Sequence, residues 1–105
     1  IAALAEARGV LVVPHNPLSP VSTAACIQLA AAIPNFAIQE YPLGEDSAPK
    51  NRIVKSTLTL KDGYLTVPEG PGIGIELNES AMNDYPYKPR LYVTKLREDG
   101  AVADQ

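Results

Sequence analysis

The chain has 105 residues, of which 46% are hydrophobic and 20% are charged, so a disordered or fibrous protein is excluded. This length predicts one small domain or a piece of a larger one. The net charge is −3 without a basic cluster, which argues against nucleic acid as a partner.

Charge is unevenly distributed along the chain. The 31 residues between Arg8 and Glu40 carry no formal charge apart from a possible one on His15. Prolines and polar residues interrupt this segment, so it contains no transmembrane helix, and a membrane partner is not expected. The single Cys26 cannot form an intrachain disulfide, which favours a reducing, cytoplasmic compartment.

The first element predicted is a helix over residues 1–8, followed by Gly9 in the position typical of a helix end. Because the chain begins inside this helical pattern, we expect it to be a fragment. Residues 10–13 are apolar and β-branched, which predicts a strand buried on both faces that ends at Pro14.

A second helix and strand follow. Ser19 and Pro20 are typical of a helix start, with serine as the N-cap and proline in the first position. Residues 20–33 are Ala-rich and apolar nearly all round, which predicts a buried helix. Residues 36–40 predict a second short strand. Helices alternating with strands predict an α/β fold with a parallel sheet.

The second part of the chain is more polar and contains more turns. Asp62-Gly63 lies between alternating apolar residues and predicts a β-hairpin over about 57–67. Around it we expect a surface loop over 42–55, a short helix over 78–85 with Asn78 as its N-cap, a strand over 90–97 and a tail over 98–105.

Two polar residues stand where the predicted strands end. His15 follows the first strand and Glu40 is the last residue of the second. Parallel strands bring their carboxyl ends to the same edge of a sheet, where ligands bind. A carboxylate beside a histidine suits proton transfer. The ordinary alternative is a hydrogen-bonded loop histidine and a solvated glutamate.

The other candidates have simpler interpretations. Cys26 lies within an apolar helix and is expected to be a small buried hydrophobe. The glycine string Gly70, Gly72 and Gly74 lacks the strand and helix that a phosphate loop requires. Four acidic residues without metal-ligand spacing are expected to be solvated, and no zinc site is predicted: Glu45, Asp46, Asp62 and Glu69.

Two long segments carry a resemblance to a known family. The segment PHNPLSPVSTAACIQLAAAIPNFAIQEYP resembles the seventh and eighth strand region of the enolase superfamily, in its mandelate racemase and muconate lactonizing enzyme branch. TLTLKDGYLTVPEGPGIGIELNE resembles the segment that follows the barrel in the galactonate-type acid-sugar dehydratases of that branch, and DGAVAD resembles their end. A histidine followed 25 positions later by a glutamate is part of this likeness.

The resemblance implies the C-terminal fragment of a modified (β/α)8 barrel. Residues 1–41 would be the last βα units, with strands at about 10–14 and 36–40 and a helix at about 20–33. Residues 42–105 would form the C-terminal segment that follows the barrel. A separate capping domain would belong to the full-length enzyme, which we expect to be a homo-oligomer.

The resemblance also implies a chemistry. Such enzymes use Mg²⁺ and remove the proton alpha to a carboxylate of a small sugar acid; a dehydratase then expels a β-hydroxyl to give a 2-keto-3-deoxy acid. His15 would act as general base or acid, oriented by an aspartate from the sixth strand. Glu40 would hydrogen-bond the substrate carboxylate as charge develops. The metal ligands and that aspartate would lie in missing upstream strands, so we expect the isolated chain to be inactive.

Two alternatives stay open. A racemase, epimerase or cycloisomerase of the same superfamily shares the proton removal and differs in the fate of the intermediate. A small α/β binding module is the alternative from a different class, with His15 and Glu40 in structural roles. The weakly polar helix over 20–33 argues against a self-contained module.

Overall fold

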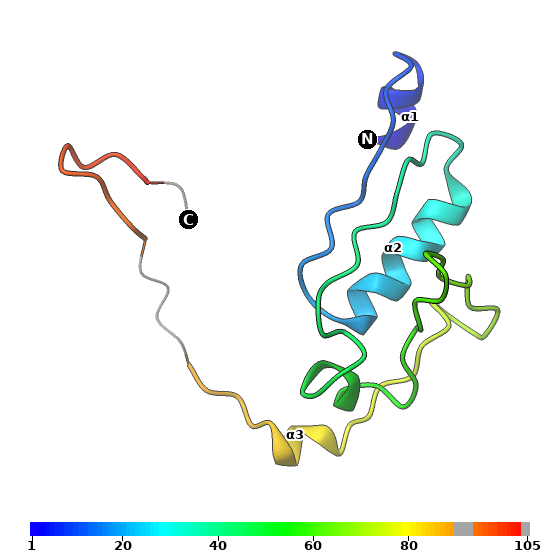
Figure 1. Cartoon of the computed structure of the whole chain (residues 1–105), viewed down its shortest axis with the longest axis vertical. Coiled ribbons are helices and arrows are strands. Elements are labelled where there is room, and N and C mark those ends of the chain that lie inside the picture. The colour runs from blue at the N-terminus through cyan, green and yellow to red at the C-terminus, as the bar shows by residue number, and fades with distance from the viewer. Residues whose placement is uncertain (90–93, 104–105) are drawn as a thin grey trace.

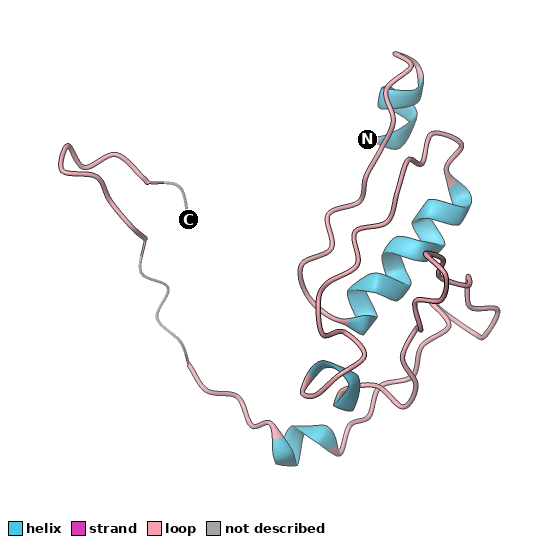
Figure 2. Ribbon diagram, viewed as in Figure 1, coloured by secondary structure: helices cyan, strands magenta, loops and turns pink. Residues whose placement is uncertain are grey.

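The computed structural model describes residues 1–89 and 94–103 of the chain. Within them, the helices are α1 (Ala2–Glu6), α2 (Pro20–Ala32), the short 3₁₀ helix η1 (Lys50–Arg52) and α3 (Ala81–Asp84). Helix α2 is the longest, and two extended segments run beside it (Figure 1). These described residues contain isolated β-bridges and no β-strand (Figure 2).

The two extended segments pair in parallel at a single point. Val12 and Phe36 form a parallel bridge. The amide of Val12 donates to the carbonyl of Asn35 at 2.8 Å, and the amide of Ala37 donates to the carbonyl of Val12 at 3.0 Å. The predicted parallel direction is therefore confirmed at this bridge.

The predicted strands at 10–14 and 36–40 are wrong as hydrogen-bonded strands, and so is the prediction of burial on both faces. Val10, Leu11 and Val13 are each more than half exposed. A parallel strand is stable when neighbours flank it and helices cover both faces. Here each segment has one partner and α2 on one side, so the ladder stops after one bridge.

Helix α2 begins at Pro20, as predicted. Ser19 has an extended backbone, and its carbonyl accepts the amide of Thr23 at 3.0 Å, while its hydroxyl makes no capping bond. The helix ends at Ala32, one residue before the predicted end. One side of α2 is buried, and the opposite side is exposed, so burial all round is also a wrong prediction.

The first helix is shorter than the predicted range of 1–8, because α1 ends at Glu6. The chain then turns through Gly9, whose φ of +66° suits glycine at a helix end. Asn35 connects this region to the second extended segment. Its buried side-chain amide donates to the carbonyls of Ala2 at 3.1 Å and Val10 at 2.9 Å.

The turn of the predicted hairpin is present. Lys61 and Tyr64 exchange two backbone hydrogen bonds of 2.9 and 2.8 Å around Asp62 and Gly63. Both central residues have positive φ, +52° and +82°, as a two-residue hairpin turn requires. This bridge is isolated, so the flanking parts of 57–67 form no further ladder.

The hairpin region packs near α2 and the second extended segment. Gln28 of α2 donates to the carbonyl of Pro68 at 2.9 Å, and the hydroxyl of Tyr41 donates to the carbonyl of Leu58 at 3.1 Å. A tight turn follows, in which the amide of Gly74 donates to the carbonyl of Pro71 at 3.1 Å. The division of the chain at residue 41 stays a prediction.

The segments 53–55 and 76–78 pair in antiparallel fashion. Lys55 donates its amide to Glu76 and Asn78 donates its amide to Ile53, both at 2.9 Å. The side chains of Lys55 and Glu76 form an exposed ion pair.

Helix α3 is shorter than the predicted 78–85, and its N-cap is Ser80 rather than Asn78. Asn78 instead accepts the amide of Ala81 at its carbonyl, at 3.0 Å, so it closes the turn before the helix.

The C-terminal part extends away from the rest of the described chain (Figure 1). Residues 90–93 of the predicted strand over 90–97, and residues 104–105 of the tail, lie outside the described residues. Leu96 and Val102 form one antiparallel bridge. Across residues 1–89 and 94–103, no helix combines the length and apolar character needed to cross a membrane.

Candidate active site

His15 and Glu40 lie together, each just after one of the two parallel segments. The Nδ1 atom of His15 is 2.8 Å from Oε2 of Glu40, across 25 positions of sequence. The expectation that both side chains emerge at the same end of the pair is therefore confirmed. Their side chains are 78% and 42% exposed, so the pair is accessible from solvent.

The carboxylate of Glu40 is held in its ionised form. The backbone amide of Asn16 donates to Oε2 at 2.6 Å. This bond, followed by the bond from His15 and its charge, lowers the pKa of Glu40 below its ordinary value of 4.5, against a smaller opposing effect of burial. Glu40 is thus a charged acceptor at neutral pH.

This charge defines the role of each nitrogen in the His15 ring. An ionised carboxylate only accepts hydrogen bonds, so the proton between the two groups belongs to Nδ1. In the neutral imidazole, Nε2 then carries the free lone pair and can take up a proton. The arrangement is a histidine–carboxylate pair suited to general acid–base chemistry.

Asn16 is the residue of this site that sequence reasoning missed. Its side chain is fully buried, and Nδ2 donates to Oγ1 of Thr23 at 2.7 Å and to the carbonyl of Glu40 at 2.9 Å. The sequence feature that could have indicated Asn16 is its position between a histidine and a proline in an uncharged segment.

The remaining singled-out residues lie outside this network. Cys26 is half-buried, and its Sγ is 4.0 Å from the carbonyl oxygen of His15, at the limit of a weak contact. Gly72 and Gly74 have positive φ and belong to turns. Asp46, Asp62 and Glu69 are exposed, as expected for solvated loop residues.

Glu45 is a correction, because it is buried rather than solvated. Its exposed fraction is 0%, and neither carboxylate oxygen has a hydrogen-bond partner among the described residues. Its amide donates to the carbonyl of Pro42 at 3.3 Å, which closes a turn. Burial, followed by the charges of Glu45 and Asp46, raises the pKa of Tyr41 above its ordinary value.

The described residues do not provide a magnesium site. They contain no group of three or more His, Cys, Asp or Glu side chains that could hold a metal ion. The carboxylate of Glu40 stands alone and already accepts bonds from His15 and Asn16. Mg²⁺ requires an octahedral set of oxygen ligands, which this pair does not offer.

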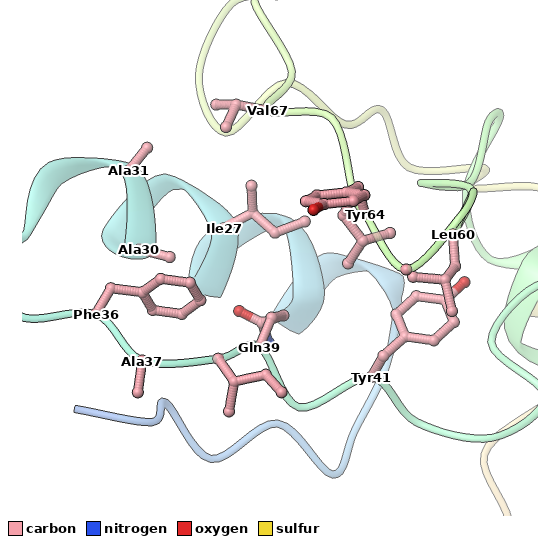
Figure 3. A pocket seen from close by; sticks show the side chains of 13 residues that line it. Ile27, Ala30, Ala31, Phe36, Ala37, Gln39, Tyr41, Leu60, Tyr64 and Val67 are labelled. Carbon is pink, nitrogen blue, oxygen red and sulfur yellow. The ribbon is translucent and has the colours of Figure 1, made fainter. Parts of the chain in front are cut away.

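A separate apolar cavity lies between α2, the second extended segment and the hairpin (Figure 3). Its volume is about 570 Å³, and its lining includes Ile27, Phe36, Gln39, Tyr41 and Tyr64. Neither His15 nor Glu40 lines it, so the cavity and the polar pair are different features of the fold.

Comparisons with known proteins identify the family that this chain resembles. Residues 1–81 match the family described as enolase C-terminal domain-like. A D-galactonate dehydratase family member from Streptomyces bingchenggensis is 38% identical over 106 residues, covering 99% of this chain and 25% of that protein. The chain thus spans about a quarter of the length of this relative.

Two solved structures are also similar. An enolase from Agrobacterium radiobacter, with bound sodium and L-malate, is 37% identical with a TM-score of 0.78, covering 96% of this chain and 29% of that one. A protein from Burkholderia xenovorans, with a proposed L-alanine-DL-glutamate epimerase activity, is bound to magnesium and fumarate in its structure. It is 31% identical with a TM-score of 0.76, and the match covers 83% of this chain and 21% of that one. These matches confirm the resemblance found in the sequence and support an α/β part of a TIM-barrel enzyme. The chain belongs to the enolase C-terminal domain-like family of the enolase superfamily.

Proposed function

We propose that this chain supplies an acid–base histidine, His15, and its carboxylate partner, Glu40, to a sugar-acid dehydratase. The observation that carries the proposal is the 2.8 Å hydrogen bond between Nδ1 of His15 and Oε2 of Glu40. The dehydratase names of the relatives support the reaction class. Because the chain covers about a quarter of such a relative, other parts of the enzyme complete the active site.

In this proposal, His15 moves the proton through Nε2. Glu40 holds the Nδ1 proton, which orients the ring and stabilises the imidazolium that forms when Nε2 takes a proton. Removal of the proton alpha to the substrate carboxylate leaves an enediolate. The β-hydroxyl then takes up a proton and departs as water, and the resulting enol tautomerises to a 2-keto-3-deoxy acid.

The proposed role of Glu40 differs from the one that the resemblance implied. An ionised carboxylate cannot donate a hydrogen bond to a substrate carboxylate, and the bonds to Glu40 favour its ionised form. In the arrangement observed here, Glu40 is instead the orienting partner of His15.

Mg²⁺ is proposed as the cofactor of the complete enzyme, with all of its ligands in residues outside this chain. Bound magnesium in the Burkholderia xenovorans relative supports this part of the proposal. Mg²⁺ would supply electrostatic stabilisation of the developing anion. Since His15 and Glu40 do not form its site, proton transfer by this pair and metal binding should be separable by mutation.

An epimerase is the second candidate, favoured by the epimerase activity proposed for that structural relative. Both reactions begin with removal of the α-proton. They differ because a dehydratase loses the β-hydroxyl, whereas an epimerase returns a proton to the α-carbon. Products formed in D₂O distinguish them: a keto acid indicates dehydration, and an α-deuterated epimer with all hydroxyls retained indicates epimerisation.

The central experiment replaces His15 in the full-length enzyme. His15→Asn should lower keto-acid formation from a panel of sugar acids by at least about 100-fold, because it removes the group that transfers the proton. Mg²⁺ affinity, measured by calorimetry, should be unchanged. Cys26→Ser is the control, since the Sγ of Cys26 lies 4.0 Å from the main-chain carbonyl of His15 and forms no hydrogen bond to the imidazole among the described residues. Wild-type turnover by His15→Asn would remove this residue from the mechanism.

A second substitution tests the role of Glu40. Glu40→Gln keeps the shape and supplies a donor, so it would preserve activity if Glu40 only hydrogen-bonded the substrate. We expect kcat to fall by about 10- to 100-fold, because a neutral amide stabilises the imidazolium of His15 less well. Glu76→Gln, at an exposed glutamate, is the control. An unchanged kcat for Glu40→Gln would contradict the orienting role.

A further inference from the structure

We propose that the loop over residues 42–51 binds a monovalent cation, K⁺ or Na⁺, through the carboxylate of Glu45 and the side-chain oxygen of Asn51. This site is separate from the histidine–carboxylate pair, and the inference does not depend on the proposed function. It follows from three buried side-chain oxygens of one loop, none of which has a hydrogen-bond partner among the described residues.

Glu45 carries the buried charge of this loop. Its exposed fraction is 0%, and both of its carboxylate oxygens lack a hydrogen-bond partner within the described part of the chain. An ionised carboxylate without hydrogen bonds or a counter-charge is highly unfavourable in a protein interior. The carboxylate of Glu45 therefore needs a positive charge or a proton beside it.

Asn51 adds a third oxygen. Its Nδ2 donates to the main-chain carbonyl of Asp46 at 2.9 Å, which holds the Asn51 side chain against the residue that follows Glu45. Its backbone amide donates to the carbonyl of Ser47 at 3.0 Å. The Oδ1 atom of Asn51 is buried and has no hydrogen-bond partner in residues 1–89 and 94–103. The loop thus contains three unpaired acceptor oxygens, two from Glu45 and one from Asn51.

The side-chain donors of the loop bind main-chain carbonyls instead of these oxygens. Nζ of Lys50 donates to the carbonyl of Leu43 at 3.3 Å, and Oγ of Ser47 donates to the carbonyl of Gly44 at 3.0 Å. The Asn51 amide is used in the same way. Hard cations bind oxygen atoms of carboxylates, amides and carbonyls, so this surplus of acceptors is typical of a cation site.

The charge of the loop interior favours a monovalent ion. Glu45 is the one buried carboxylate among the described residues, and its neighbour Asp46 is exposed. One monovalent cation neutralises this single charge, whereas a divalent ion would leave a surplus positive charge in the interior. The described residues also contain no group of three or more His, Cys, Asp or Glu side chains that could hold a metal ion.

The complete burial of Glu45 favours a small ion over a basic side chain from another part of the enzyme. An arginine or lysine side chain would need an open surface through which to reach the carboxylate, and Glu45 exposes none. A dehydrated K⁺ or Na⁺ ion is bound by the loop's own oxygens and needs no such surface.

The test compares thermal unfolding of the full-length enzyme in KCl, NaCl and choline chloride. Equal ionic strength keeps general screening of charges constant. A cation that binds the folded state raises the unfolding midpoint. We expect the wild-type midpoint to be about 2–4 °C higher in KCl or NaCl than in choline chloride. The difference between KCl and NaCl identifies the preferred ion.

Two substitutions locate the effect. Glu45→Gln removes the charge, keeps the shape and should abolish the difference between the salts. Asp46→Asn is the matched control, because it removes the same charge from the neighbouring, exposed residue and should keep the difference. Equal wild-type midpoints in the three salts would overturn the proposal. So would a difference that persists in Glu45→Gln, or one that is lost equally in Asp46→Asn.

A proton on Glu45 is the competing explanation. The three salts would then give one midpoint, and the stability of the wild type relative to Glu45→Gln would rise as the pH falls, which overturns the proposal. Crystals of the full-length enzyme grown with Tl⁺, an anomalous scatterer that substitutes for K⁺, provide a direct check. We expect an anomalous peak at the Glu45 carboxylate, and its absence there would overturn the site. Neither measurement uses a substrate, so both stand even if the proposed reaction is wrong.

Discussion

The hydrogen bonds to Glu40 converge on one of its two carboxylate oxygens. Both Nδ1 of His15 and the amide of Asn16 are bound to Oε2. Within the described residues, Oε1 accepts no hydrogen bond and is the oxygen left available to a substrate or to water. The two hydrogen bonds to Glu40 therefore use one oxygen and leave the other without a donor among the described residues.

The pKa of Glu40 leads to a prediction about stability. Since the folded state lowers this pKa below 4.5, the ionised carboxylate stabilises the fold fully above that pH. The contribution is lost as the pH falls through the lowered pKa of the folded state. In the full-length enzyme, the stability difference between wild type and Glu40→Gln should be largest near neutral pH and should shrink below pH 4.5.

Urea unfolding at a series of pH values measures this difference. Glu76→Gln again serves as the control, since its carboxylate lies in an exposed ion pair. A difference between wild type and Glu40→Gln that grows with acidification would contradict the proposed charge state.

The sequence predicts His15 and Glu40 as residues of the candidate site, but it does not predict Asn16. The first two are polar groups at the ends of apolar runs, where the geometry of parallel segments places them together. Asn16 acts partly through its backbone amide, a donor that nearly every residue possesses. Its side-chain partners lie 7 and 24 positions away, at spacings that no periodic pattern marks.

Helix α2 is the element that the sequence predicts best, because its signals are local. Serine followed by proline indicates the start, and the run of alanines favours the helix within its own span. The extended segments are less predictable. Their apolar residues indicate strands, but a strand exists only through hydrogen bonds to neighbours, and Val12 and Phe36 form the one bridge between them.

The turn around residues 70–74 contains two glycines whose substitution by alanine should destabilise the fold to different extents. Gly72 and Gly74 both have positive φ, +66° and +76°. A Cβ on Gly74 would collide with the ring of Pro68, whereas a Cβ on Gly72 would meet no atom within 4 Å. Gly72→Ala should cost about 1–2 kcal/mol from backbone strain, and Gly74→Ala about 1–3 kcal/mol more from the collision.

Chemical unfolding of the two variants in the full-length enzyme compares these costs. Both glycines share the unfavourable backbone region, so the difference isolates the contact with Pro68. Equal destabilisation by the two substitutions would show that Pro68 moves aside without cost.

The molecule as a whole is more open than a compact domain of its length. The radius of gyration is 17.2 Å, against about 13 Å for a compact chain of this size. Among the described residues, four hydrophobic side chains are buried, namely Ala24, Ile27, Val54 and Ala81, whereas Leu11, Ile38 and Leu43 are largely exposed. So few buried apolar groups provide little of the driving force that a stable fold requires.

The isolated 105-residue chain should therefore self-associate or remain loosely folded. Leu11→Ser combined with Ile38→Ser should reduce that association, because both side chains are more than 60% exposed. Size-exclusion chromatography and thermal unfolding followed by circular dichroism measure the effect. A soluble monomer with a sharp, reversible transition would contradict this prediction.

The length of flexible chain between His15 and Glu40 affects the entropic cost of bringing these two residues together. His15 and Glu40 are 25 positions apart, and 13 of the residues between them belong to α2. The entropic cost of closing a loop rises with its flexible length, by about 0.6 kcal/mol for each doubling. A formed α2 roughly halves that length, since 25 less 13 leaves 12, and lowers the cost accordingly. The helix thus contributes to the pair by shortening the flexible part of the chain that must close to bring His15 and Glu40 together.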